Sequence, residues 1–302
     1  MAGTQALTGG NFYGAVQRQQ QLHDAIFTDL RHVSGKKLPA HSHALPFFGL
    51  LLDGHYGERY RHREKQFGPF SLMYRPAGIP HQDEIAPGGL RFFEIEILPR
   101  WNRQLTECSA NLETPCEDCV GGQVFWLAMR LFRETRGKAD DGQAYQSDLC
   151  VESLLAELLG AIGEMPRETT KDAPSWLTRI TDKLKTEYCD RLTLNELGEE
   201  AGVHPVHLSR VFRRCMKQGI GDYIHRLRIR AACEQMLSPE MTLAEIGIAV
   251  GFADQSHFTR VFRKVTGMSP AAFRALVREE RAAMECYTSG AGTAELPLGS
   301  SL

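Results

Sequence analysis

Apolar and polar residues in the first third of the chain follow the pattern of short strands. The clearest apolar segments are Phe47–Leu52, Phe70–Tyr74 and Leu90–Leu98, and Gly, Pro and Asp lie between them. In the third segment apolar residues alternate with glutamates, which predicts a strand with one buried face. Several short strands without helices between them predict an antiparallel sandwich or barrel over residues 21–100, after a flexible arm at residues 1–20.

The apolar spacing becomes helical after Pro99. We predict helices at Val124–Arg136 and Ala144–Gly163. The second helix carries one apolar stripe, which is formed by Val151, Leu154, Leu155, Leu158 and Ile162. Such a stripe needs a partner surface, which is either the barrel or the same helix of a second subunit. We therefore expect residues 120–165 to be a helical segment of the dimerisation type, followed by a linker at residues 166–175.

The C-terminal third contains an internal repeat. The first copy, Thr193–Arg214, is TLNELGEEAGVHPVHLSRVFRR, and the second, Thr242–Lys264, is TLAEIGIAVGFADQSHFTRVFRK. Each copy opens with Thr followed three residues later by Glu, which is a capping box at a helix start. Each then has apolar residues at helical spacing and a Gly, at position 202 or 251, where the chain must turn sharply. The pattern predicts two helix-turn-helix units.

The second helix of each unit has a polar outer face suited to DNA. Arg can contact guanine edges with two hydrogen bonds, and Ser, Thr and Gln reach other base edges or phosphates. A single helix with Arg outside is more often only a solvated face, and the matched second copy is what favours DNA binding. The predicted contact residues are Val206, Ser209, Arg210, Arg213 and Arg214 in the first unit, and Gln255, Ser256, His257, Thr259, Arg260, Arg263 and Lys264 in the second.

A long helix is predicted between the two units, at Asp222–Leu237. It would hold the two recognition helices at a fixed separation, and about 34 Å would place them in successive major grooves. A short final helix from Ser269 to Arg278 closes the domain, which we assign to residues 176–283. The small and Gly-rich residues 284–302 are expected to be a disordered tail.

Composition and charge agree with a two-domain protein and with an intracellular location. The chain has 302 residues, 42% hydrophobic and 24% charged, with a net charge of −2. The charge is uneven, because residues 176–283 carry 17 Lys and Arg against 13 Asp and Glu. The first 21 residues lack the apolar segment of a signal peptide, and no apolar run approaches the length of a membrane span. Together with eight Cys, this predicts a cytoplasmic protein with reduced thiols and no membrane partner.

The region from residue 176 to residue 281 resembles the DNA-binding domain of the AraC/XylS family of regulators. The resemblance rests on EEAGVHPVHLSRVFRR, on Arg228 and Ala231 in the long helix, and on AEIGIAVGFADQSHFTRVFRKVTGMSPAAFR. It implies binding to double-stranded promoter DNA, usually with activation of transcription, contact with RNA polymerase and control by a small-molecule effector. It implies a regulator and not an enzyme, with no catalytic residues, and we expect a homodimer.

Two motifs in the N-terminal half resemble those of cupins. They are Gly35-x5-His41-x-His43 and Pro76-x-Gly78-x2-His81. They imply a cupin-like sensor barrel, so the predicted fold class is α+β: an antiparallel cupin-like β-barrel, two dimerisation-type helices and an all-α domain with two helix-turn-helix units. The Glu that follows the second His in metal-binding cupins is missing from the stretch 45–48, and Ile85 replaces the usual Asn.

The barrel is predicted to bind a small molecule or a divalent metal. His41, His43 and His81 are candidate ligands, because three neutral imidazoles with an open position suit Zn, Ni, Cu or Fe. The alternative is that these His are structural or belong to a pocket for a small organic molecule. That pocket is predicted to be lined by His43, Phe47, Arg59, Tyr60, Tyr74, His81 and Phe93.

Other interpretations stay open at this point. One is a metal-dependent cupin enzyme fused to a DNA-binding domain, and another is a regulator that binds DNA without any ligand. Cys108, Cys116 and Cys119 include a CxxC spacing typical of metal or redox sites, although free thiols in a loop explain it as well.

Overall fold

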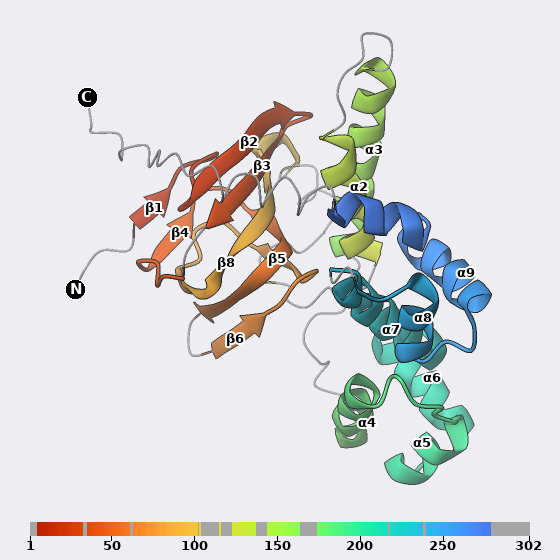
Figure 1. The fold of residues 1–302 in the computed structure, drawn as a ribbon. Coiled ribbons are helices and arrows are strands. Elements are labelled where there is room, and N and C mark those ends of the chain that lie inside the picture. Colours follow the sequence, from red (N-terminus) through yellow and green to blue (C-terminus); the bar gives the residue numbers. More distant parts are fainter. Residues whose placement is uncertain are drawn as a thin grey trace, which may run out of the picture.

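A sheet, two covering helices and a group of C-terminal helices make up the chain, as seen in the computed structural model (Figure 1). The structure describes residues 5–32, 35–60, 63–101, 103, 115, 123–136, 144–163, 174–216, 218–237 and 240–278. The predicted linker lies almost entirely outside these ranges, and so do the predicted tail and the three cysteines at 108, 116 and 119.

Eight strands form one curled sheet. They are β1 (Gln5–Leu7), β2 (Ala15–Leu22), β3 (Ala25–His32), β4 (His41–His43), β5 (Phe47–Tyr60), β6 (Arg63–Phe67), β7 (Leu72–Arg75) and β8 (His81–Ile97). The order is β1-β4-β8-β3-β2, and β5 pairs with β6, β7 and β8. All these pairs are antiparallel except β1 with β4. The α+β class with an N-terminal sheet and C-terminal helices is confirmed.

The sheet curls where β5 bends against β8. The register between these strands shifts on both sides of Gly54, which has a φ of 85°. A Cβ at Gly54 would lie 2.2 Å from the carbonyl oxygen of Gly89, so a larger residue does not fit there. The bulge lets one long strand turn from one part of the curled sheet to the next.

Both faces of the second half of β8, from residue 89 to residue 97, are buried, which corrects the prediction of one buried face. Phe93 and Ile95 pack in the core under the helices, as the alternation suggested. Glu94 and Glu96, expected on a solvated face, have only 5% and 0% of their surface exposed. The reason is the curl: the sheet folds around its second face, so that polar residues of β8 point into an enclosed interior.

The predicted flexible arm at residues 1–20 is also corrected. Residues 5–7 form β1 beside β4, and β2 pairs with β3 along its length. The side chains of β2 are mostly exposed and polar, so no apolar alternation marks it in the sequence. It is an edge strand held by backbone hydrogen bonds rather than by burial.

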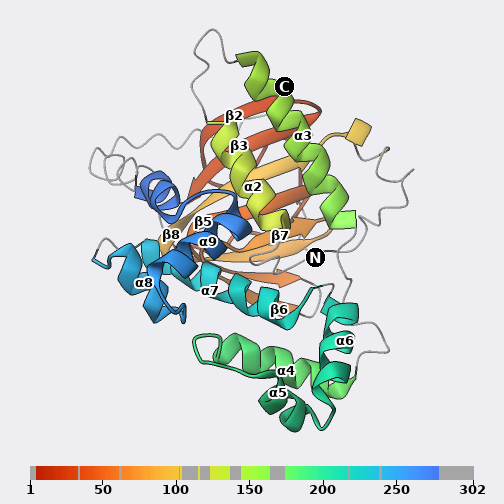
Figure 2. The same ribbon diagram turned by 90° about the vertical axis from the view of Figure 1, so that its right-hand side faces the viewer.

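Helices α2 (Gln123–Glu134) and α3 (Ala144–Gly163) cover the outer face of the sheet (Figure 2). The apolar stripe of α3 is buried in the core that α2 and the sheet share. Two partner surfaces were considered for this stripe, the barrel and the same helix of a second subunit. In the structure the stripe packs within its own chain. Dimerisation through these helices stays a prediction.

Six helices and a closing helical segment form the C-terminal part. They are α4 (Ser175–Thr186), α5 (Leu194–Ala201), α6 (Pro205–Met216), α7 (Ile220–Met236), α8 (Leu243–Ala249) and α9 (Gln255–Thr266), with residues 270–278 also helical. These bounds match the helices expected from the repeat and from the long segment between its copies. In the part of the chain that the structure describes, no helix combines the length and apolar character needed to cross a membrane.

Candidate functional site

The two repeats form the same local structure. In the first, the Thr193 hydroxyl accepts a hydrogen bond from the backbone N–H of Glu196 at 3.2 Å, and the Thr193 N–H donates to Glu196 Oε2 at 2.8 Å. Thr242 and Glu245 repeat this pattern at 3.2 and 2.7 Å. These bonds lower the pKa of both glutamates. Both predicted capping boxes are confirmed.

The turn glycines and one further cap fix where each recognition helix begins. Gly202 and Gly251 have φ values of 68° and 94°, in the left-handed region that favours glycine. Before α9, the Asp254 carboxylate accepts from the N–H of His257 at 2.7 Å. Sequence analysis missed this cap, although an Asp directly before the apolar helical pattern is a typical signal for one.

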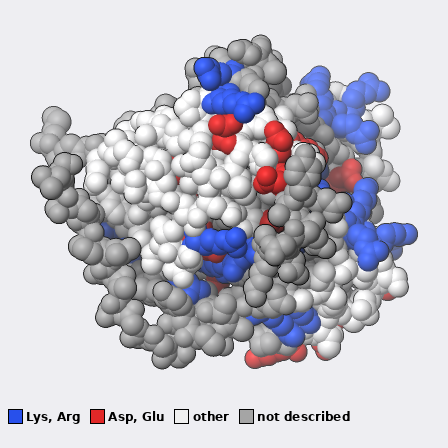
Figure 3. Space-filling view, turned by 90° about the horizontal axis from the view of Figure 1, so that it is seen from above, with Lys and Arg blue, Asp and Glu red and all other residues white. Residues whose placement is uncertain are grey.

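The inner faces of α6 and α9 are buried and their outer faces are exposed. Phe212, Phe258 and Phe262 have none of their surface accessible to water. Of the twelve predicted DNA contacts, nine are exposed, and Ser209, His257 and Thr259 are half-buried. The six residues that line one open hollow along α9 are Gln255, Ser256, Thr259, Arg260, Arg263 and Lys264. Figure 3 shows Lys and Arg gathered at the edge of the molecule formed by the C-terminal helices.

His257 differs from its neighbours on this face. Its ring lies 5.3 Å from the ring of Phe252 and 5.9 Å from that of His225. It therefore packs against Phe252, which follows α8, and against α7. Of the other predicted contacts of α9, all except the half-buried Thr259 are exposed.

Arg228 on α7 ties the two helix-turn-helix units together. Its guanidinium donates to the carbonyl oxygens of Tyr188 at 2.7 Å, Asp190 at 3.0 Å and Gly251 at 2.5 Å. Tyr188 and Asp190 precede the first unit, and Gly251 is the turn of the second. Because Arg offers several donors in a rigid plane, one side chain fixes both segments against α7.

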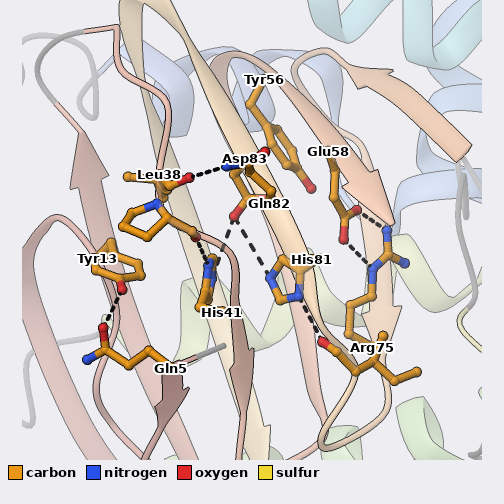
Figure 4. Close-up of polar contacts among 12 residues, drawn as sticks. Gln5, Tyr13, Leu38, His41, Tyr56, Glu58, Arg75, His81, Gln82 and Asp83 are labelled. Atoms are coloured by element: carbon orange, nitrogen blue, oxygen red, sulfur yellow. Dashed lines mark hydrogen bonds and ion pairs between the residues drawn. The ribbon is translucent and has the colours of Figure 1, made fainter. Parts of the chain in front are cut away.

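A cavity lined by apolar side chains and by a group of His, Asp and Glu residues lies inside the curled sheet. His41 and His43 come from β4 and His81 from β8, and their potential metal-binding nitrogens all lie within 4.8 Å of one another. The predicted convergence of these three residues therefore occurs. The Nε2 atoms of His41 and His81 lie 3.8 and 3.9 Å from Oδ2 of Asp83, between the two rings (Figure 4).

Hydrogen bonds set the tautomers of two of these histidines. Nδ1 of His41 is 2.9 Å from the carbonyl oxygen of Pro39, and Nδ1 of His81 is 3.1 Å from that of Ile79. A carbonyl oxygen only accepts, so each Nδ1 carries the proton and each Nε2 keeps its lone pair.

Burial keeps the three imidazoles neutral. Desolvation, reinforced by the neighbouring histidines, lowers the pKa of His41 to about 4 and that of His43 to about 2. The pKa of His81 is also lowered, mainly by desolvation. Desolvation and the nearby Glu58 raise the pKa of Asp83 well above its usual value.

Asp83 was missed by sequence analysis, although it stands two residues after His81 on the same strand. That spacing places both side chains on one face. Glu58 lies close to His81 and Asp83 as well, but Arg75 holds it, with Nε donating to Glu58 Oε1 at 2.8 Å and Nη2 donating to the other oxygen.

Only three of the seven residues predicted to line an organic-ligand pocket come together. His43, Phe47 and His81 line the cavity, whereas Tyr74 and Phe93 lie on the opposite face of the sheet in the core under α2 and α3. Arg59 is exposed and paired with Glu64 at 3.7 Å, and Tyr60 lies under the Arg75 guanidinium, whose carbon is 6.0 Å from the ring centre. The cavity volume is about 40 Å³, which is room for a few waters or an ion.

Comparison with known proteins identifies the C-terminal region. Residues 197–276 match the family described as "Helix-turn-helix domain". The arabinose operon regulatory protein of Salmonella typhimurium is 31% identical over 145 residues, which are 45% of this chain and 50% of that protein. The HTH-type transcriptional activator AarP of Providencia stuartii is 28% identical over 108 residues, or 36% and 80% of the two chains.

A third relative carries a second activity in its name. The bifunctional transcriptional activator/DNA repair enzyme AdaA of Bacillus subtilis is 30% identical over 105 residues, or 35% of this chain and 50% of that protein. The aligned part spans about half the length of this relative and of the arabinose regulator. The C-terminal region of this chain is therefore a helix-turn-helix domain similar to those of AraC-type transcriptional regulators.

Proposed function

We propose that this chain binds promoter DNA sequence-specifically and regulates transcription, under control of a small ligand sensed by its N-terminal half. The observation that carries the proposal is the pair of matched units whose recognition helices, α6 and α9, bury their apolar faces and expose rows of Arg. If these Arg residues only formed a solvated helix face, a second copy with the same cap, turn and inner residues would not be needed.

The outer residues divide by role. Arg210 and Arg260 stand near the middle of their helices and lead base contact, assisted by Ser209, Gln255, Ser256 and Thr259. Arg213, Arg214, Arg263 and Lys264, nearer the C-terminal ends, contact phosphates. Two relatives are named as activators, which supports activation as the output, with RNA polymerase and a second copy of the chain as partners.

Control by the N-terminal half has a direct structural route. The ring centre of Trp126 on α2 lies 6.3 Å from that of Phe262 on α9 and 6.2 Å from that of Phe273 in the closing helix. A ligand that favours one arrangement of the sheet and α2 would shift the population of arrangements of the second unit. The proposed role is regulation and not catalysis.

Selection of bound fragments from random DNA, followed by quantitative binding, tests this proposal. Arg260→Ala should cost about 1–3 kcal/mol of specific binding and relax base preference at one position. Arg263→Ala should weaken binding to all sequences alike and reduce the salt slope by about one unit. Arg133→Ala, which removes an exposed Arg from α2, is the matched control and should change neither quantity. Unchanged affinity and specificity in both variants of α9 would refute the assignment.

A further inference from the structure

We infer that a cleft between α2, α7 and α9 binds a small organic anion with an apolar body, and that a ligand in this cleft weakens DNA binding by the two recognition helices. The first part depends only on the cleft. The second part rests on the proposed function.

The cleft lies outside the curled sheet, where α2 faces the C-terminal helices. Helices α2, α9 and α7 follow one another downward in Figure 2, and residues of α6 and of the turn before α7 complete the walls. The volume of the cleft is about 690 Å³, within the range of about 300–1,000 Å³ that is usual for organic ligands. The cavity inside the sheet has only about 40 Å³, so an organic ligand fits the cleft and not the sheet interior.

Positive charge prevails along the walls of the cleft. The four cations that line it are Arg130 on α2, Arg213 on α6, Arg226 on α7 and Lys264 on α9. Only two carboxylates line it, those of Glu157 and Asp222, and Asp222 lies 3.8 Å from Nζ of Lys264. Desolvation by burial lowers the pKa of Arg226 in spite of the nearby Asp222. A bound anion would therefore stabilise the charged form of Arg226.

Two of these cations come from the two recognition helices and meet at the start of α7. A Cβ at Gly219 would lie 3.4 Å from Nη2 of Arg213 and 3.5 Å from Oδ2 of Asp222. The Arg213 guanidinium thus lies over the turn before α7, beside the carboxylate that pairs with Lys264. One anion in the cleft can therefore engage both recognition helices.

The rest of the wall selects an organic anion over an inorganic one. Trp126 and Leu127 of α2 and Val261 and Val265 of α9 line the cleft beside the cations. A phosphate or sulfate ion would leave this apolar surface in contact with water, whereas a ligand with an apolar body would cover it. Apolar walls with a few charged groups are typical of sites for small organic molecules.

Two residues of the cleft hold buried polar atoms that need partners. Nε1 of Trp126 and Oε1 of Gln218 are buried and form no hydrogen bond with any described residue. Trp126 has only 4% of its surface exposed, so water does not readily supply the missing bond. The indole N–H only donates and the amide oxygen only accepts. An oxygen of the anion would satisfy the first, and a hydroxyl or amino group of the ligand would satisfy the second.

A ligand in the cleft would compete with DNA for two positive charges. Arg213 and Lys264 line the cleft and are also proposed to contact phosphates. An anion that neutralises them removes two charges from the DNA-binding surface, which lowers affinity and salt dependence together. The ligand would also contact Trp126, whose ring centre lies 6.3 Å from that of Phe262 on α9. We therefore expect the ligand to oppose DNA binding.

The binding test titrates the purified full chain with anilinonaphthalene sulfonate, an organic anion whose fluorescence rises when it leaves water. We expect one saturable site per chain. The matched neutral compound is phenylnaphthylamine, which has the same rings without the sulfonate and should bind at least about tenfold more weakly, since it lacks the charge-assisted hydrogen bonds.

Three variants locate the site. Arg130→Gln and Arg226→Gln each remove one cation that is not a predicted DNA contact, and each should weaken binding of the sulfonate about tenfold. Trp126→Phe keeps an aromatic ring without the N–H and should weaken it about fivefold. Arg133→Gln removes an exposed Arg of α2 that does not line the cleft, and this matched control should bind like wild type.

Melting curves show whether each variant folds, so a loss of binding can be assigned to the cleft. No saturable binding of the sulfonate by the folded wild-type chain overturns the site. Equal affinity for the neutral compound overturns the preference for an anion. Affinities of Arg130→Gln and Arg226→Gln equal to that of wild type would place the bound sulfonate elsewhere and also overturn the site.

The regulatory part is tested by fluorescence anisotropy of selected DNA that carries a red dye, with and without saturating sulfonate. We expect the sulfonate to lower the DNA affinity of wild type at least about fivefold and the salt slope by about one to two units. Arg226→Gln at the same sulfonate concentration should lose most of this response.

The remaining outcomes separate the two proposals. If Arg130→Gln and Arg226→Gln weaken DNA binding without the sulfonate as much as Arg213→Ala does, the DNA backbone occupies the cleft and the ligand assignment is overturned. Binding of the sulfonate without any change in DNA affinity overturns the regulatory part. No sequence-specific DNA binding under either condition overturns the proposed function, while the stoichiometry of sulfonate binding still stands as its own result.

Discussion

The two helix-turn-helix units follow one sequence plan and lie in two different cores. In the first unit, Leu197, Leu208 and Phe212 pack with α4 and the start of α7 in a core of their own. In the second, Phe258 and Phe262 belong to a core that continues through α2 into the sheet. Helices with the same outer chemistry therefore have different connections: the second unit contacts the N-terminal half directly, and the first is reached through α7.

Helix α7 is shared between the two cores. Ile220 at its start packs with the first unit, whereas Ile229 and Met236 pack with the second. Arg228, near the point where the cores meet, is bonded to backbone of both units. A rearrangement of the second unit would therefore be transmitted to the first through α7 and the guanidinium of Arg228.

The largest effect is expected from truncating Trp126. Trp126→Ala should lower the free energy of unfolding by about 3–5 kcal/mol, because a buried ring is lost between α2 and α9. In hydrogen exchange measured by mass spectrometry, α2 and α9 should exchange faster while α5 and α6 stay as in wild type. Trp176→Ala in the core of the first unit should do the reverse. Faster exchange of all four helices in both variants would show that the two cores behave as one.

A smaller loss of stability is expected from truncating Arg228, which connects the two units. Arg228→Ala should cost about 2 kcal/mol of stability, since three backbone carbonyls lose a charged donor. Binding to DNA with both half-sites should fall more than binding to a single half-site, because the spacing of the recognition helices is no longer fixed. Arg228→Lys keeps the charge without the planar donors and should recover only part of the effect. Equal losses on both DNAs would mean that Arg228 does not set the spacing.

The smallest effects on stability are expected from removing the capping box of either unit, and they should be confined to that unit. Thr193→Ala and Thr242→Ala each remove one capping box and should each cost about 1 kcal/mol. Exchange should rise in α5 for the first variant and in α8 for the second. The matching Ser variants, which keep the hydroxyl, should behave like wild type. A Thr193→Ala variant that loosens α8 as much as α5 would remove the distinction between the units.

Local features were predictable wherever neighbouring residues supply the interactions. The ends of α3, the caps of α5 and α8 and the turns at Gly202 and Gly251 depend on residues within a few positions of each other, so their spacing revealed them. Asp83 had a local signal as well, two residues after His81, but nothing local showed that this face of β8 was enclosed. β2 had no signal, because an exposed edge strand is held by pairing with β3 and not by its own side chains.

From the sequence alone, periodicity and short spacing predicted the two helix-turn-helix units and their exposed Arg rows, whereas the expectation that His81 meets His41 and His43 came from the cupin resemblance and depends on the pairing of β4 with β8. The tertiary structure alone decided that Glu94 lies in an enclosed interior, that Tyr74 and Phe93 face away from the cavity, and that only the second unit shares a core with the sheet. The physical reason is that curvature of the sheet and docking of α2 join residues far apart in the chain, and which surfaces they enclose depends on all of those contacts at once.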